Sequence, residues 1–449
     1  MLDRPLAPPG STGTSLETLV LQVGRELGAV DGELLLGEAL PCLAGRALSQ
    51  EADRVTDGID VALARSETPG VANVVHLNNA GAALMPSPVV ARMMGYLERE
   101  AAIGGYESEA EADAEIGAVY GSIARLVGGS PDEIAVCENA TRAWDMAFYT
   151  LPYGPGDRIL TSGVEYTSNF LAMLQIARRT GAVVEVIPDA PTGELSIDAL
   201  EGMLDERVRL VAITHVPSHS GLVNPAAEVG RLTRPLGIPF LLDACQSVGQ
   251  MAIDVEAIGC DMLAATSRKF LRGPRGMGFL YVRRDLADGL EPPFVDYRSA
   301  RWTSRDEYRL EDGARRFENW ETNYAAKVGL GVAVDYALGW GLDAIEARVV
   351  ALADRLRAGL AGTEGVAVHD PGTRRSAIVT FTVAGRDPSA VAADLHARRI
   401  NVSVSDVAYH RLGLESRGLG SVVRASVHYY NTETELDTFI EAVAAPAGP

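Results

Sequence analysis

The stretch that decides the fold is Thr266-Ser267-Arg268-Lys269-Phe270-Leu271-Arg272-Gly273-Pro274-Arg275-Gly276. It lies between two apolar runs, residues 261–265 and 277–282, and each run predicts a β-strand. A lysine at the end of a strand is ordinarily a solvated surface residue, since lysine is rarely buried without a partner. Here, however, a second polar segment, Asp243-Ala244-Cys245-Gln246, closes the apolar run 238–242 upstream.

An acid at one strand end and a lysine at a later one suit a particular cofactor. Pyridoxal 5'-phosphate needs an amine for its aldehyde and an anion beside its ring nitrogen, and enzymes supply them as a Schiff-base lysine and an aspartate. The two segments therefore predict a pyridoxal phosphate enzyme in which Lys269 holds the aldehyde and Asp243 holds the pyridinium.

Length and composition limit the classes of protein. At 449 residues the chain exceeds the usual single-core limit of about 250–300, so one large and one small domain are expected. Apolar residues make up 47%, enough for buried cores. The net charge of −20 argues against a nucleic-acid partner, which would need a basic face.

The cysteines and the N-terminus predict a cytoplasmic protein. The chain has four cysteines, without a Cys-x-x-Cys pair or a histidine at ligand spacing, so neither a zinc site nor a disulfide framework is expected. The first ten residues lack the basic and apolar segments of a secretory signal. No run of about 20 apolar residues predicts a membrane span.

Three regions are predicted along the chain. Residues 1–70 form an N-terminal extension, in which Leu16, Leu19, Val20, Val23 and Leu27 give residues 14–27 the apolar face of a helix. That face packs on the chain's own body or on a second protomer, or it docks a separate partner. Residues 71–325 form a large cofactor-binding domain, and residues 326–449 form a small C-terminal domain.

Strand-like and helical segments alternate through the large domain. Strands are predicted near 134–137, 158–161, 183–187, 208–214, 238–243, 261–265 and 278–282. Such alternation predicts an α/β fold, a mostly parallel seven-stranded sheet with helices on both faces. The C-terminal part, with helices near 324–339 and 342–360 and strands at 377–383 and 422–426, predicts a smaller α+β domain.

The strand-Asp-Ala-x-Gln segment, the Ser-x-Lys and the Gly-Pro-x-Gly together resemble the class V aminotransferase family, which has fold type I of the pyridoxal phosphate enzymes. The resemblance covers residues 74–445. It implies that Lys269 also moves the substrate's Cα proton, that Ala244 lies flat against the ring, and that Gln246 donates to the ring hydroxyl. It also implies a homodimer whose active sites share residues, and an amino acid as substrate.

The same resemblance predicts the phosphate site. Ala140 and Thr141 stand at the family's phosphate-binding turn before a helix, where backbone N–H groups bind anions. Thr266 matches a phosphate-binding serine or threonine, and Arg268 supplies charge. Thr322 matches a loop that reaches the phosphate of a second protomer; the alternative is a simple turn between domains.

The substrate residues also follow from the resemblance. Tyr166 takes the ring-stacking place that a histidine has in relatives, but a phenol with a pKa of about 10 does not shuttle protons near pH 7. Arg424 is expected to clamp the carboxylate, because a guanidinium binds it bidentately. Further contacts are assigned to Ser218, Asn79 and Tyr106, and His219 is either a proton donor or a structural histidine.

An absence directs the prediction of the reaction. Cysteine desulfurases carry a persulfide on a loop cysteine before the carboxylate arginine, and residues 401–424 contain none. The sequence therefore disfavours a persulfide-forming desulfurase and, through a resemblance to the ergothioneine C–S lyase branch, predicts β-elimination from a cysteine S-conjugate to a thiol, pyruvate and ammonia. The open alternatives are decarboxylating oxidative deamination, epimerisation, and a non-catalytic scaffold that holds the cofactor.

Overall fold

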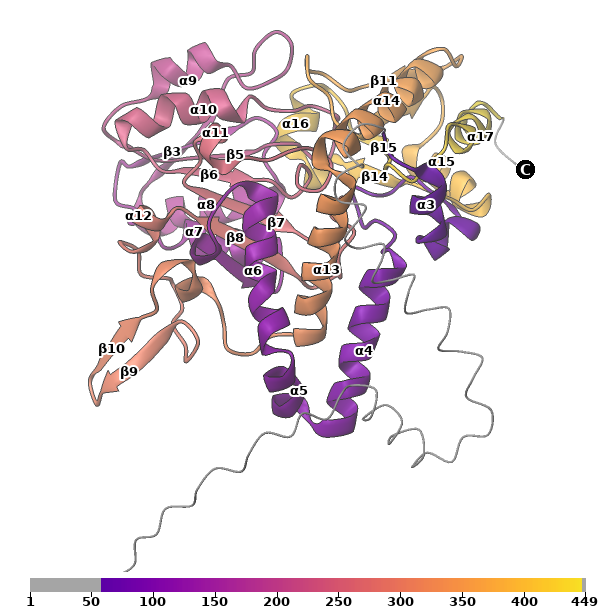
Figure 1. The fold of residues 1–449 in the computed structure, drawn as a ribbon. Coiled ribbons are helices and arrows are strands. Elements are labelled where there is room, and N and C mark those ends of the chain that lie inside the picture. Colours follow the sequence, from indigo (N-terminus) through magenta and orange to yellow (C-terminus); the bar gives the residue numbers. More distant parts are fainter. Residues whose placement is uncertain (1–57, 446–449) are drawn as a thin grey trace, which may run out of the picture. The chain divides into compact units, whose positions relative to one another are not determined.

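The computed structural model describes residues 58–445 (Figure 1). The helix predicted at residues 14–27 lies outside the described residues. The described chain begins with α3 (Val61–Ser66), which the structure ties to the C-terminal part: Arg65 donates to the carbonyl of Tyr430 at 3.0 Å and pairs with Glu435 at 2.8 Å.

A seven-stranded sheet forms the centre of the fold and confirms the predicted architecture. Its strands run in the order β2-β8-β7-β6-β5-β3-β4, and β8 is antiparallel to both of its neighbours. The strands are β2 (Ile134–Cys137), β3 (Arg158–Ser162), β4 (Val183–Ile187), β5 (Val208–Thr214), β6 (Phe240–Asp243), β7 (Met262–Thr266) and β8 (Gly278–Val282).

The sheet is covered on both faces, which explains why its strands are continuous apolar runs. Phe240 and Leu242 of β6 belong to one buried cluster, whereas Leu241 between them belongs to the other. The covering helices include α6 (Asp113–Val127), α7 (Ala140–Phe148), α8 (Thr167–Thr180), α9 (Ile197–Met203), α10 (Ala226–Thr233) and α11 (Val255–Ile258). Successive residues of a strand therefore serve two different cores.

The C-terminal part contains a four-stranded antiparallel sheet in the order β11-β12-β15-β14. Its elements are α14 (Leu342–Ala361), β11 (Val366–Val368), β12 (Ile378–Val383), α15 (Pro388–Ala397), β13 (Ile400–Asn401), β14 (Ser403–Asp406), α16 (Arg411–Glu415), β15 (Ser421–Ser426) and α17 (Glu433–Ala444). The first strand, β1 (Val75–His76), pairs in parallel with β13, so residues near 75 join the C-terminal part. The domain boundaries at 70 and 325 stay predictions.

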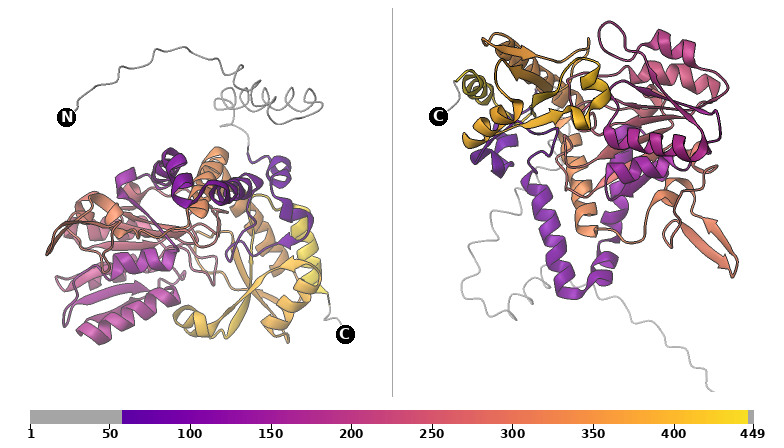
Figure 2. Two further views of the ribbon diagram at one scale, coloured as in Figure 1. Left: turned by 90° about the horizontal axis from the view of Figure 1, so that it is seen from below. Right: turned by 180° about the vertical axis from the view of Figure 1, so that it is seen from behind.

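Several elements project from the two sheets (Figures 1 and 2). Helices α4 (Ser87–Ile103), α5 (Gly105–Glu111) and α6 form one projection, and α13 (Tyr324–Trp340) packs against α4 and α6. The hairpin of β9 (Ala300–Ser304) and β10 (Glu307–Leu310) forms another; it was not predicted, because its side chains are mostly exposed and lack a clear apolar alternation. The exposed aromatic side chains Tyr106 and Trp302 lie on these projections.

Among residues 58–445, no single helix is long and apolar enough to span a membrane. Helices α13 and α14 satisfy the length and composition criteria only as a pair, with a bend of 78° between them.

Candidate active site

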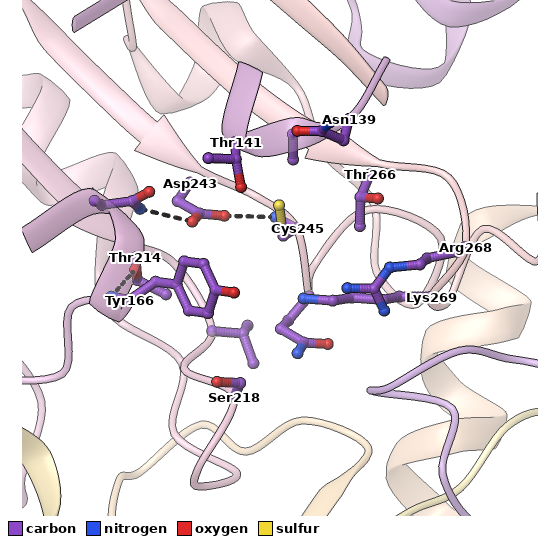
Figure 3. A pocket seen from close by; sticks show the side chains of 14 residues that line it. Asn139, Thr141, Tyr166, Thr214, Ser218, Asp243, Cys245, Thr266, Arg268 and Lys269 are labelled. Atoms are coloured by element: carbon purple, nitrogen blue, oxygen red, sulfur yellow. Dashed lines mark hydrogen bonds between the residues drawn. The ribbon is translucent and has the colours of Figure 1, made fainter. Parts of the chain in front are cut away.

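A cavity of about 110 Å³, open to solvent, lies where β6 and β7 end (Figure 3). Because β5, β6 and β7 are parallel, the residues that follow them meet at one edge of the sheet. The lining includes Ser218, which was predicted for the substrate, and most of the residues predicted for the cofactor: Ala140, Thr141, Tyr166, Asp243, Gln246, Thr266, Arg268 and Lys269.

Lys269 lies in the turn after β7 with its side chain in the cavity, and only 8% of the residue is exposed. Burial lowers the pKa of its ammonium from the ordinary value, because a charged amine loses its hydration. A larger fraction of neutral amine is what both Schiff-base formation and proton abstraction need.

Asp243, the last residue of β6, is held by two hydrogen bonds. One carboxylate oxygen accepts from Nδ2 of Asn169 at 2.8 Å and the other from the backbone N–H of Cys245 at 2.9 Å. Asn169 in turn donates to Glu165 at 2.8 Å. The Asp243 carboxylate is therefore fixed in orientation at the wall of the cavity.

Glu165 is a functional residue that the sequence did not assign. It is buried, and its carboxylate accepts from the hydroxyl of Thr214 at 2.6 Å. Burial, together with the nearby charge of Asp243, raises the pKa of Glu165 from 4.5 to about 7. The available signal was the position of Glu165, just before the N-cap of α8 and four residues before Asn169.

Of the two residues predicted to lie against the cofactor ring, Tyr166 lines the cavity and Ala244 does not. Tyr166, just before α8, lines the cavity as expected for a ring-stacking residue. Ala244 is fully buried outside the lining, and Cys245 lines the cavity instead. Burial, with Asp243 nearby, raises the pKa of the Cys245 thiol well above its ordinary value.

Gln246 is oriented differently from the prediction. Its Nε2 donates to the carbonyl of Ala80 at 3.1 Å, whereas its buried Oε1 has no hydrogen-bond partner within residues 58–445. The atom left for a ligand is therefore an acceptor, and it suits a hydroxyl that donates its proton.

The start of α7, where the phosphate turn is predicted, lines the cavity. Asn139 caps the helix by accepting from the N–H of Arg142 at 2.9 Å, and Ala140 and Thr141 follow in the cavity lining. Gly278 of β8 packs against this turn: a Cβ placed on it would lie 2.8 Å from the nitrogen of Ala140. The first backbone donors of α7 are thus held by close packing on β8.

Thr266 and Arg268 approach the cavity from β7 and the turn that follows it. The Arg268 guanidinium donates to the carbonyl of Gly81, and burial lowers the pKa of Arg268. A helix N-terminus, a hydroxyl and a guanidinium therefore line one cavity, and this donor set fits a phosphate.

Arg424 on β15 lies beside the substrate end of this region. Its guanidinium donates to the carbonyl of Ser218 at 2.8 Å and to Oδ1 of Asn78 at 3.1 Å, while Nε has no partner in the described part of the chain. Burial lowers the pKa of Arg424 to about 10. A buried guanidinium with an unsatisfied donor fits a substrate carboxylate.

Asn79, predicted to contact substrate, is fully buried with its amide engaged. Its Nδ2 donates to the carbonyl of Ser426 at 2.8 Å, and its Oδ1 accepts from the hydroxyl of Tyr430 at 2.5 Å. The neighbouring Asn78, at the start of a turn, contacts Arg424 instead.

Thr322 and Tyr106 lie away from Lys269, at a second cavity formed by α5 and the segment before α13. Tyr106 is 73% exposed. Neither residue lines the cavity that contains Lys269, and their roles toward cofactor and substrate stay predictions. His219 is buried behind Ser218 and does not line the cavity.

The residues fit pyridoxal phosphate at each functional group of the cofactor. The described residues offer a buried lysine with a lowered pKa for the aldehyde, an oriented carboxylate for the ring nitrogen, an unpartnered amide oxygen for the hydroxyl and backbone donors at a helix start for the phosphate. In residues 58–445 no group of three or more His, Cys, Asp or Glu side chains is arranged to hold a metal.

Comparison with known proteins supports the same conclusion. Residues 75–439 match the family model for class V aminotransferases. A probable cysteine desulfurase from Methanothermobacter thermautotrophicus is 31% identical over 392 residues, which are 86% of this chain and 97% of that protein. A cysteine desulfurase from Dickeya dadantii is 30% identical over 379 residues, with coverages of 82% and 90%.

The fold is shared with solved structures. The apo structure of the cysteine desulfurase from Thermococcus onnurineus superposes with a TM-score of 0.80 at 28% identity, covering 85% of this chain and 96% of that one. The chain belongs to the class V aminotransferase family of fold type I pyridoxal phosphate enzymes. Family membership confirms the predicted fold and the predicted cofactor.

The predicted reaction is wrong. The relatives are cysteine desulfurases, the class that the sequence analysis disfavoured, and the comparisons give no specific support for β-elimination from an S-conjugate or for a place in the ergothioneine-lyase branch. The error lay in the weight given to the missing loop cysteine. A loop thiol determines where the sulfur goes, whereas the residues around the cofactor determine which bond breaks.

Proposed function

We propose that this chain is a pyridoxal phosphate-dependent cysteine desulfurase that acts on L-cysteine. L-Cysteine and an acceptor thiol R–SH give L-alanine and the persulfide R–S–SH: the Cβ–S bond and the S–H bond of the acceptor break, a Cβ–H bond and an S–S bond form, and atoms and electrons balance. The observation that carries the proposal is the convergence of Lys269, Asp243 and Arg424 in a chain that matches desulfurases over 86% of its length.

Each residue has a defined task. The bound cofactor withdraws electrons from the substrate's Cα. Lys269 takes the Cα proton, because its amine is buried and its pKa is lowered. Arg424 binds the carboxylate, Asp243 provides the anion beside the ring nitrogen, and Tyr166 covers the ring.

The thiol that accepts the sulfur atom cannot be a cysteine of the loop before Arg424, where other desulfurases have one. Residues 401–424 contain no cysteine. Of the three cysteines in the described part of the chain, Cys245 is the one that lines the cavity, and its raised pKa keeps it a thiol. A thiol must ionise to attack sulfur. We therefore assign the acceptor role to a thiol from outside the chain.

We further propose a cytoplasmic homodimer. Thr322 and Tyr106 carry family roles but lie at a second cavity of the same chain, and Leu97, Tyr106 and Trp320 leave apolar surface exposed around it. A second copy would cover this surface and bring Thr322 to its active site. Free cysteines fit a reducing compartment.

The test is a product assay with purified holoenzyme, L-cysteine and dithiothreitol as external thiol. We expect alanine and sulfide in equal amounts, and neither from Lys269→Ala. Cys245→Ser and Cys42→Ser are expected to keep the activity; Cys42 is included because it lies outside the described residues. Pyruvate and ammonia in place of alanine would overturn the proposal, and loss of activity in either cysteine variant would assign the acceptor to the chain.

A further inference from the structure

His219 is a buried imidazole without hydrogen bonds. It is 1% exposed, and neither Nδ1 nor Nε2 has a hydrogen-bond partner among residues 58–445. Most buried side-chain polar atoms in proteins are hydrogen-bonded, and an unsatisfied one needs an explanation. Ser218, which precedes it, lines the cavity, so the unpartnered ring lies one residue from the cavity wall.

A second unpartnered imidazole packs on it. His410 lies between β14 and β15, in the loop that holds the persulfide cysteine in desulfurases. The ring centroids of His219 and His410 are 4.7 Å apart with an interplanar angle of 30°. Nδ1 of His410 is also buried and without a partner in the described chain.

Neighbouring contacts hold this loop against the cavity. The hydroxyl of Thr167 donates to the carbonyl of Tyr409, next to Tyr166 of the cavity wall. On the other side, the hydroxyl of Ser405 donates to the carbonyl of Ser218 at 3.4 Å. A Cβ at Gly413 would collide with Nε2 of His219, so the absence of a side chain there makes room for the ring.

Both rings are neutral near pH 7. Burial lowers the pKa of His219 well below its ordinary value, and His410, Arg417 and Arg424 add to the effect. Burial also lowers the pKa of His410 to about 4, with Arg424 and Lys269 lowering it further and Asp406 opposing them. A neutral imidazole keeps one acceptor nitrogen, which is what a thiol hydrogen needs.

We propose that His219 and His410 form the binding site for the side-chain sulfur of the substrate and give the enzyme its preference for cysteine over alanine. The proposal rests on the function assigned above, because it takes the substrate to be cysteine. Arg424, which binds the carboxylate, donates to the Ser218 carbonyl, and His219 is the next residue in the chain. The charges of Arg424 and Lys269 both act on His410, so the pair lies near the carboxylate site and the reacting lysine. The substrate thiol then provides a hydrogen-bond partner for these nitrogens.

The test measures equilibrium binding in the cofactor-loaded Lys269→Ala protein, which does not turn over. Dissociation constants for L-cysteine and L-alanine are read from the cofactor's absorbance. His410→Phe keeps the aromatic packing on His219 but removes the nitrogens. We expect it to raise the dissociation constant for cysteine about five- to tenfold, as for the loss of one hydrogen bond, and that for alanine by less than twofold.

Two further variants keep the test decisive. His410→Gln retains a donor and an acceptor and is expected to restore the preference for cysteine. His396→Gln, at an exposed position on α15, is the matched control and should change neither constant. Equal changes for cysteine and alanine in His410→Phe, or none, would overturn the proposal. Failure of the proposed function is recognised separately, because the wild type would then release no alanine from cysteine. Even in that case, loss of the preference for binding cysteine in His410→Phe would support the sulfur site.

Discussion

Replacing Glu165 by glutamine tests the electrostatics around Asp243. The carboxylate of Glu165 accepts four hydrogen bonds. Three of them go to Oε1, and Oε2 accepts only from the hydroxyl of Thr161. A hydroxyl can accept as well as donate, so the amide nitrogen of glutamine can keep a hydrogen bond to Thr161. The substitution therefore removes a titrating group and changes little else.

The magnitude follows from the raised pKa of Glu165, which lies at about 7 in the folded protein instead of 4.5. A group whose pKa is raised on folding stabilises the protein fully below the unfolded pKa, and this contribution disappears as pH rises through the folded pKa. Between pH 4.5 and 8 the loss amounts to about 3 kcal/mol. The glutamine variant has no such loss.

The assay is the thermal midpoint of the cofactor-free wild type and of Glu165→Gln across pH 4.5 to 8. Groups far from residue 165 titrate equally in both proteins, so we compare the difference in Tm. The wild type should lose on the order of 5 °C relative to the variant as pH rises. A difference that does not depend on pH would refute the reasoning, since Glu165 would then be ionised throughout the range.

Three further predictions concern binding and assembly. Arg424→Gln should raise KM for cysteine about 100-fold with a smaller effect on kcat, because it removes a buried charge-assisted contact with the carboxylate. Steady-state kinetics measure both constants, and a fall in kcat alone would contradict this role. A randomly reassociated 1:1 mixture of Lys269→Ala and Thr322→Val subunits should recover about a quarter of wild-type activity if sites are shared, because half of the dimers are mixed and each mixed dimer has one intact site of two; it should recover none if each chain works alone. Gly278→Ala should weaken cofactor binding about tenfold or more by displacing the phosphate turn, while Gly289→Ala, where a Cβ meets only ordinary contact, is the control in a cofactor titration.

The sheet was predictable from sequence because its strands are buried on both faces. A strand of this kind is an apolar run, and seven such runs separated by helical segments define a parallel α/β sheet. The hairpin β9–β10 carried no such signal, since its side chains face solvent. The burial of a strand thus determined whether it could be predicted from the sequence.

The ends of the strands also indicated where the active site lies. Residues that follow parallel strands meet at one edge, so the sequence alone places Asp243 and Lys269 together. Their residue types then specified the cofactor. The reaction was not specified in this way, because the missing loop cysteine concerns the sulfur acceptor alone.

Only the tertiary structure decided the contacts between distant segments. The sequence does not show that Asn78, and not Asn79, lies beside Arg424, because the choice depends on the pairing of residues near 78 with β15. Nor does it show that His219 stacks on His410, far along the chain. Apolar patterning and strand order are local properties of a sequence, whereas hydrogen-bond partners and pKa values are set by whichever groups folding brings within a few ångströms.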